Sequence, residues 1–166
     1  MFTRELLETT DKLLRLCQEA GLQLVTAESC TGGLVAGCLT EVPGASNVLE
    51  RGFVTYSNES KTALLGVPAE LFERVGAVSE EVARAMAEGA LAKTQADLSI
   101  AVTGMAGPGG GTKEKPVGLV HMAAAARGQA PCHEQHFFQG DRTEVRLQSV
   151  HAAISLLTKL VEGRMA

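Results

Sequence analysis

The sequence has very few aromatic residues: no tryptophan, one tyrosine and five phenylalanines among 166 residues. A core built from this composition must be aliphatic, with leucine, valine, alanine and isoleucine supplying most of the buried surface. There is no aromatic platform and no basic stripe, and the formal net charge is −4, which argues against nucleic acid as the main partner. No apolar run approaches the roughly 20 residues that a membrane helix needs, so no membrane contact is expected.

Paired cysteines and an export signal are also absent. The N-terminal stretch MFTRELLETTDKLLRL carries charges throughout, which is not typical of a signal peptide. We therefore expect a cytoplasmic protein with reduced thiols. There are four cysteines, and their spacing shows no pairing: Cys17, Cys30, Cys38 and Cys132.

One short cluster, Cys132, His133 and His136, raises the question of a metal site. If this stretch is a strand, His133 and His136 point to opposite faces of the sheet and cannot share one ion. We expect these side chains to be solvated. No other cluster has ligand spacing, so the sequence predicts no metal and no cofactor.

The length fits a single domain over residues 1–166, with no repeat, low-complexity tract or linker. Apolar stripes, capping residues and glycine stops predict helices over 3–20, 31–41, 59–65, 68–74, 80–93 and from 141 onward. Buried apolar runs predict strands over 22–27, 51–57, 97–103, 117–126 and 131–138, the last two a candidate hairpin. Strands alternating with helices, followed by a hairpin, predict an α/β fold: a three-layer α/β/α sandwich with a mixed sheet.

The segment Thr26–Gly33 (TAESCTGG) lies where a predicted strand ends and a helix begins. The hydroxyl of Ser29 at this junction is a candidate nucleophile, and the glycines allow a ligand to approach the backbone. Free N–H groups at the start of the helix can stabilise an anion. The alternative is ordinary helix capping by Ser29 or Thr31, which such residues perform routinely.

A second polar segment, Tyr56–Lys61 (YSNESK), follows another predicted strand and contains the single tyrosine. A serine nucleophile needs a base, and Lys61 can act as one if burial lowers its pKa from the usual value of about 10.4. The hydroxyl of Tyr56 can then orient the pair or relay a proton. The alternative is a half-buried Tyr56 and a solvated Lys61, because most lysines are solvated.

Three further segments are candidates for holding a ligand. A glycine-rich loop, Gly104–Thr112, follows a buried strand but matches neither the Walker A pattern nor the dinucleotide-binding pattern. Arg142 stands at the start of the last helix and suits a phosphate. Pro43–Ser46 can also hold a phosphate through Ser46 and backbone N–H groups, although a plain turn explains it equally well.

Five motifs together resemble the C-terminal domain of the CinA family: TAESCTGG (26–33), GFVTYSNESK (52–61), GAVSEEVA (76–83), TGMAGPGGGTKEKPVG (103–118) and GDR (140–142). The likeness covers nearly the whole chain in order. Longer CinA proteins carry an N-terminal molybdopterin-binding-like domain that this sequence lacks. The chain is therefore expected to correspond to the stand-alone form, which resembles a nicotinamide-nucleotide amidohydrolase.

The resemblance implies hydrolysis of nicotinamide mononucleotide to nicotinic acid mononucleotide and ammonia, without metal or cofactor, by a homo-oligomer. It places the nucleophile on Ser29, the base on Lys61 and an associated tyrosine on Tyr56. Two alternatives stay open: a catalytically silent pyridine-nucleotide-binding module that acts through partners, and an amidase for another heteroaromatic amide. The residues expected to bind substrate are Cys30, Thr31, Gly32, Gly33, Gly44, Ser46, Asn58, Thr103, Gly104, Gly107 and Arg142.

Overall fold

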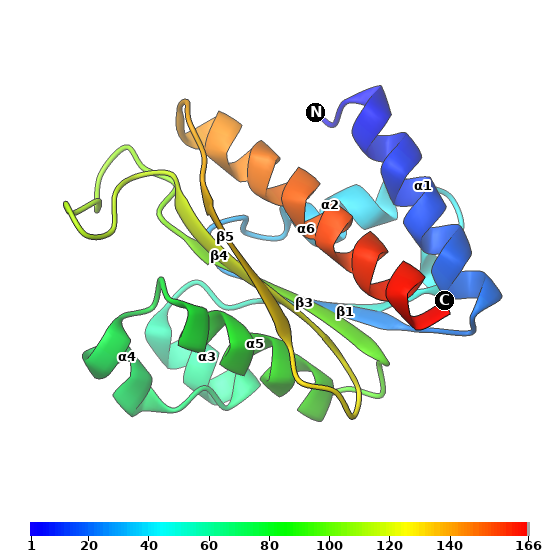
Figure 1. Ribbon diagram of the computed structural model, residues 1–166, viewed down its shortest axis with the longest axis horizontal. Coiled ribbons are helices and arrows are strands. Elements are labelled where there is room, and N and C mark those ends of the chain that lie inside the picture. The colour runs from blue at the N-terminus through cyan, green and yellow to red at the C-terminus, as the bar shows by residue number, and fades with distance from the viewer. Residues whose placement is uncertain (166) are drawn as a thin grey trace.

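A five-stranded mixed sheet forms the centre of the molecule in a computed structural model that describes residues 1–165 (Figure 1). The strand order is β2-β1-β3-β4-β5. The first three strands run parallel, whereas β4 is antiparallel to β3 and β5 is antiparallel to β4. The strands are β1 (Leu24–Glu28), β2 (Leu49–Val54), β3 (Leu98–Gly104), β4 (Leu119–Ala126) and β5 (Cys132–Phe137).

Helices cover both faces of this sheet (Figure 1). One face carries α1 (Arg4–Glu19), α2 (Leu34–Thr40) and α6 (Arg142–Met165). The other carries α3 (Asn58–Leu65), α4 (Ala69–Val75) and α5 (Glu80–Ala92), and a short 3-10 helix, Ala45–Asn47, precedes β2. The predicted α/β fold, a three-layer α/β/α sandwich with a mixed sheet, is confirmed.

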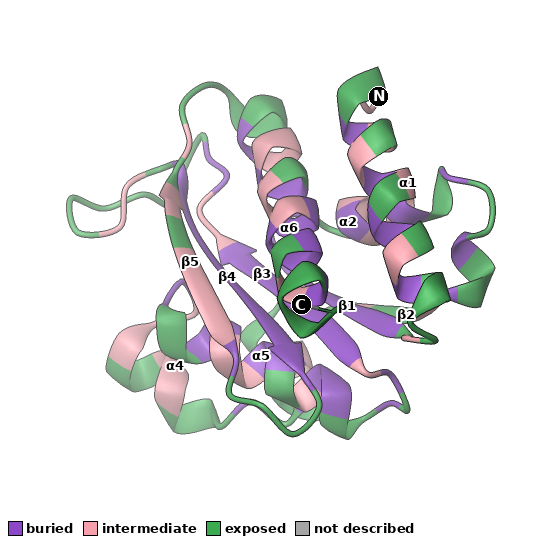
Figure 2. Cartoon of the chain, turned by 45° about the vertical axis from the view of Figure 1, so that its right-hand side comes forward, coloured by how far each residue is buried: buried purple, intermediate pink, exposed green. Residues whose placement is uncertain are grey.

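The sheet separates two aliphatic cores because side chains alternate along each strand. In β3, Ile100 and Val102 face the core under α1, α2 and α6, whereas Ala101 faces the core under α5. The central strands are buried on both faces, while the edge strands β2 and β5 are partly exposed (Figure 2). The aliphatic composition predicted such a core. Because the parallel strands β1 and β3 are buried on both faces, their sequences are nearly continuous apolar runs.

Local capping residues fix the starts of α5 and α6, one on each face of the sheet. Ser79 accepts a hydrogen bond from the N–H of Val82 and begins α5 as predicted. Asp141 and Glu144 form a reciprocal capping box at α6, with bonds of 2.7 and 2.9 Å. The sequence therefore determined where these helices begin.

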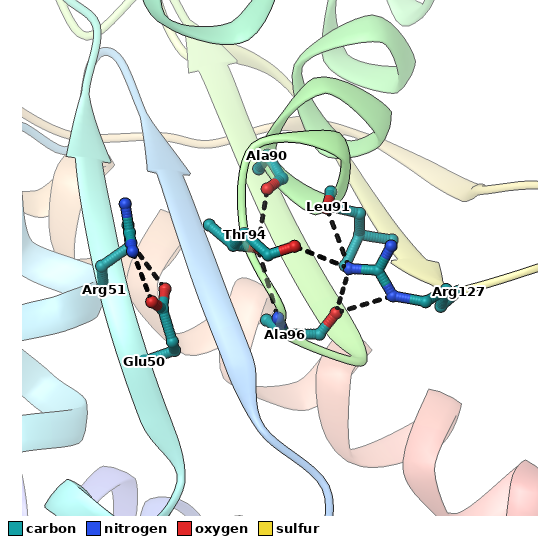
Figure 3. A network of polar contacts seen from close by, with 7 residues as sticks. All are labelled: Glu50, Arg51, Ala90, Leu91, Thr94, Ala96 and Arg127. Carbon is teal, nitrogen blue, oxygen red and sulfur yellow. Dashed lines mark hydrogen bonds and ion pairs between the residues drawn. The ribbon is translucent and has the colours of Figure 1, made fainter.

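The end of α5 is stabilised by Arg127, which lies in the turn between β4 and β5 (Figure 3). Its guanidinium donates to the carbonyl oxygens of Leu91, Thr94 and Ala96, at distances from 2.7 to 3.2 Å. Leu91 lies in the last turn of α5, whereas Thr94 and Ala96 follow the helix, so these bonds hold the β4–β5 turn against the connection from α5 to β3. The hairpin predicted around Arg127–Gly128 is confirmed.

The predicted opposite orientation of His133 and His136 is also confirmed. His133 lies beside Glu80 of α5, whereas His136 bonds to Glu134, whose other carboxylate oxygen accepts from Lys159 of α6. The expectation of solvation is wrong for His133, because its side chain is only 11% exposed and lies 2.9 Å from Nδ1 of His121. Within residues 1–165, no group of three histidine, cysteine or acidic side chains is arranged to hold a metal ion.

None of the helices that the structure describes is both long enough and apolar enough to cross a membrane.

Candidate active site

The carboxyl ends of the three parallel strands bring the polar segments of the sequence together. Ser29 directly follows β1 and bonds through its N–H to the carbonyl of Val102 in β3, at 3.0 Å. On the other side, the N–H of Thr55 bonds to the carbonyl of Glu28 at 2.8 Å. Ser29, Tyr56 and Thr103 therefore lie at one edge of the sheet, where ligands gather in such folds.

A pocket of about 240 Å³ opens at this edge. Two of its lining residues carry a full positive charge when protonated, Lys61 and Arg142, and no aspartate or glutamate lines it. The residues predicted from the sequence that line it are Ser29, Cys30, Tyr56, Asn58, Lys61, Thr103, Gly104, Gly107 and Arg142.

The amino group of Lys61 lies 3.0 Å from the hydroxyl oxygen of Ser29. The carbonyl oxygens of Thr55 and Tyr56 lie 2.8 and 3.3 Å from the same nitrogen. A neutral amine can donate its two N–H groups to these carbonyls, which leaves its lone pair for the hydroxyl proton of Ser29. The three contacts therefore suit a serine that is activated by a neutral lysine.

Burial favours the neutral form of Lys61. Its side chain is 1% exposed, although most lysines are solvated, so the interpretation of Lys61 as a surface residue is wrong. Burial lowers the pKa of Lys61 from 10.5, against a smaller raising effect of the negative charges that Cys30 and Glu59 can carry. A lysine with a lowered pKa beside a hydroxyl is an unusual arrangement that is typical of functional sites.

The turn after Ser29 differs from the prediction. The helix begins at Leu34 and not near residue 31, and its first N–H groups are not free. The buried carboxylate of Glu28 accepts from the N–H groups of Gly33, Val35 and Ala36, at 2.9–3.0 Å. The start of this helix therefore already holds a negative group from the chain itself and is not available to an anion from solution.

Arg146 holds the same turn from α6, and the sequence analysis did not identify it. Its guanidinium donates to the carbonyl oxygens of Cys30 and Thr31, both at 3.1 Å. The signal available in the sequence was its position four residues after Arg142, which places both arginines on one face of a helix.

Arg142 and Tyr56 meet at the rim of the pocket. The Arg142 guanidinium donates to the hydroxyl of Tyr56 at 2.8 Å and to the carbonyl of Gly107 at 2.7 Å. Tyr56 is 60% exposed, and it is its backbone carbonyl that contacts Lys61. The phenol therefore does not lie between Ser29 and Lys61, whose contact is direct.

A sequence profile of the CinA C-terminal domain matches residues 7–161. The chain belongs to the CinA family. A CinA-like protein of Citrifermentans bemidjiense is 49% identical over 165 residues, covering 99% of this chain, and a CinA-like protein of Geotalea daltonii is 52% identical over 159 residues, covering 95%. The chain spans 39% and 38% of the length of these two relatives.

A solved structure of the same family has nearly the same fold. The crystal structure of the competence/damage inducible protein CihA from Agrobacterium tumefaciens superposes with a TM-score of 0.94 at 46% sequence identity. The match covers 96% of this chain and 98% of that chain. The resemblance read from the five sequence motifs is confirmed at the level of the family.

Two predicted ligand residues lie elsewhere in this CinA domain. Gly44 and Ser46 line a separate cavity of about 320 Å³. They follow α2, which begins near the site and runs back along the sheet for seven residues, about 10 Å. The next strand then starts beside the N-terminal end of β1, where Leu24 bonds to Val48. The structure therefore does not bring Gly44 and Ser46 together with Ser29.

Three further predicted residues, Thr31, Gly32 and Gly33, do not line the pocket and form the turn behind Ser29. Conversely, the pocket includes Ala77 and Val78, which sequence reasoning missed. The hydroxyl of Thr103 donates to the carbonyl of Ala77 at 2.8 Å and ties this segment to β3. The signal was available, because GAVSEEVA (76–83) is one of the five CinA motifs, although its residues carry no reactive group. The other lining residues, Met105, Ala106 and Gly109, belong to the glycine-rich loop that was predicted as a whole to hold a ligand.

Proposed function

We propose that this CinA domain is a serine–lysine amidohydrolase whose substrate is nicotinamide mononucleotide. The observation that carries the proposal is the 3.0 Å contact between the buried amine of Lys61 and the hydroxyl of Ser29. A silent binding module has no need to bury a lysine against a serine, since burial of a charged amine is costly. The substrate itself comes from the family resemblance of the sequence motifs.

In the first half of the reaction, neutral Lys61 takes the proton of Ser29 as its oxygen attacks the carboxamide carbon. The carbonyl oxygen becomes an oxyanion, and the backbone N–H groups of Cys30 and Thr31, in the turn after Ser29, are the candidate donors to it. The Lys61 ammonium then returns the proton to the leaving nitrogen. The C–N bond breaks, ammonia leaves and an ester to Ser29 remains.

In the second half, water attacks this ester while Lys61 accepts a proton from the water. The ester C–O bond breaks, Ser29 regains a proton from Lys61, and the carboxylic acid product leaves. Both halves use the same base, and the carbonyls of Thr55 and Tyr56 hold its nitrogen in place throughout. No step requires a metal-bound water.

The charge of the pocket suits an anionic substrate. Arg142 uses two of its five N–H donors on Tyr56 and Gly107, so three remain for a phosphate. No carboxylate of the lining opposes a phosphate there. Binding energy from this remote group favours the nucleotide over free nicotinamide.

The decisive experiment measures ammonia release from nicotinamide mononucleotide, nicotinamide riboside, nicotinamide and a second heteroaromatic amide. Wild-type protein should release ammonia from the mononucleotide far faster than from the other three, and Ser29→Ala should release none. Faster turnover of a different amide would reassign the substrate. Binding of the mononucleotide by calorimetry with no ammonia release would instead identify a silent module.

A further inference from the structure

The turn that follows Ser29 leaves few backbone donors unengaged. The N–H of Ser29 bonds to Val102, that of Gly32 to the carbonyl of Ser29, and that of Gly33 to Glu28. Among the hydrogen bonds of the described chain, the N–H groups of Cys30 and Thr31 have no partner. Cys30 lines the pocket beside Ser29. The turn therefore offers one unengaged donor at the pocket, the N–H of Cys30, and a second directly after it, the N–H of Thr31.

Both donors are connected to Arg146 through the peptide groups of the turn. Nε of Arg146 donates to the carbonyl of Cys30, and that same peptide group carries the N–H of Thr31. Nη2 donates to the carbonyl of Thr31, whose peptide group carries the N–H of Gly32. The Gly32 N–H in turn donates to the carbonyl of Ser29, at 3.0 Å, and that peptide group carries the N–H of Cys30.

We propose that Arg146 is a positioning residue for the reaction, which orients and polarises the N–H groups of Cys30 and Thr31 as the oxyanion site. This inference rests on the proposed amidohydrolase function. Each hydrogen bond accepted by a carbonyl makes the N–H of the same peptide a better donor, by about 10–30% per bond. Arg146 thus acts on the N–H of Thr31 through one peptide group and on the N–H of Cys30 through two.

Gly32 leaves room for the guanidinium of Arg146 against the turn. Gly32 has φ +59°, and a Cβ at this residue would lie 3.3 Å from Nη2 of Arg146. A side chain would therefore be strained by the backbone and would crowd the guanidinium. Glu28 completes the arrangement, because it fixes the opposite end of the turn through three N–H groups.

The positive charge of Arg146 also acts on Cys30, which lines the pocket. Burial raises the pKa of the Cys30 thiol to about 12, while the N–H groups of Cys30 and Thr31 and the positive charge of Arg146 act in the opposite direction. Burial is the larger effect and Glu28 adds to it, so these groups reduce but do not cancel the cost of negative charge at that wall of the pocket. None of the ion pairs within residues 1–165 engages Arg146, so no neighbouring carboxylate neutralises it.

The test compares Arg146→Met, Arg146→Lys and a matched control, Arg127→Ala. Arg127 also binds carbonyl groups, but it lies at the opposite edge of the sheet, next to Asp97. For Arg146→Met, kcat for nicotinamide mononucleotide should fall about tenfold, less than for loss of a whole oxyanion donor, with KM within about threefold. Arg146→Lys should recover part of kcat, and Arg127→Ala should keep it while losing thermal stability.

A kcat of Arg146→Met within about threefold of wild type would overturn the role of Arg146 while the amidohydrolase proposal stands. A rise in KM at constant kcat would overturn it too, because Arg146 would then bind substrate. If the wild-type protein releases no ammonia, the proposed amidohydrolase function itself is contradicted. If Arg146→Met does not fold, Arg146→Lys decides: an intermediate kcat supports the inference, and wild-type kcat refutes it.

Discussion

The hydroxyl of Tyr56 accepts a hydrogen bond of 2.8 Å from Arg142, and the nitrogen of Lys61 contacts the backbone carbonyl of Tyr56 instead. The phenol is therefore coupled to a residue of the pocket rim, 86 positions further along the chain. This relationship separates two roles that the sequence left open for Tyr56, orientation and proton relay. It favours orientation.

Tyr56→Phe should lower kcat by less than about tenfold, because Lys61 takes the proton of Ser29 without the phenol. Arg142→Ala should raise KM for nicotinamide mononucleotide more than it lowers kcat, since its guanidinium contacts no reacting atom. Steady-state kinetics of both variants and of the double variant measure their coupling. Strictly additive effects on KM would contradict the contact, because residues in contact normally couple.

Ser29→Ala and Lys61→Met should each lower kcat by at least about 1,000-fold, because the nucleophile and its base act together in the same step. The double variant should be little worse than either alone. Circular dichroism and thermal unfolding check that the fold persists, which is expected because methionine retains the apolar stem of the lysine. If Lys61→Met keeps a tenth of the wild-type kcat, another residue must act as the base.

The pH dependence of kcat/KM should report Lys61. Burial lowers its pKa from 10.5, and only the neutral amine can accept a proton. Activity should therefore be low at acid pH, rise through the lowered pKa and level off before pH 10.5. A rate profile from pH 5 to 10.5 measures the midpoint, with Ser29→Ala as the background. A midpoint at or above 10.5 would contradict the buried base.

The same shift affects stability, with a definite sign. The folded protein binds the Lys61 proton less tightly than the unfolded chain does, so folding gains stability as pH rises from the lowered pKa toward 10.5. Lys61→Met removes this dependence. Its free energy of unfolding should exceed that of wild type most at neutral pH, and the difference should shrink in alkali. Chemical denaturation at pH 7 and pH 10 tests this.

Arg127→Ala should destabilise the fold by about 1–2 kcal/mol, because several carbonyls at the end of α5 lose a charged donor. The melting temperature should fall by several degrees for a chain of this size. The activity per folded molecule should not change, since the turn lies away from the pocket. Thermal unfolding and kinetics on the same sample separate the two effects. An unchanged melting temperature would show that water replaces the guanidinium without cost.

Local patterns in the sequence determined most of the fold. The apolar runs of β1 and β3, the cap at Ser79 and the capping box at Asp141 depend on residues close in sequence. Their boundaries shifted by only a few residues, and the layer order followed from the alternation of strands and helices. The family resemblance of the motifs around Ser29 and Lys61 likewise predicted that these two residues act together.

Only the tertiary structure decided how that pair is built and what surrounds it. Lys61 is 32 positions from Ser29, and its burial depends on how α3 packs against α5, which spacing along the chain does not encode. In the sequence, Gly44 and Ser46 fit a phosphate-binding loop or a plain turn equally well. Because α2 runs back along the sheet, they lie at the edge opposite Ser29. Arg146 reads as an ordinary helical cation, and it reaches the turn after Ser29 because α6 crosses the same face of the sheet as α2.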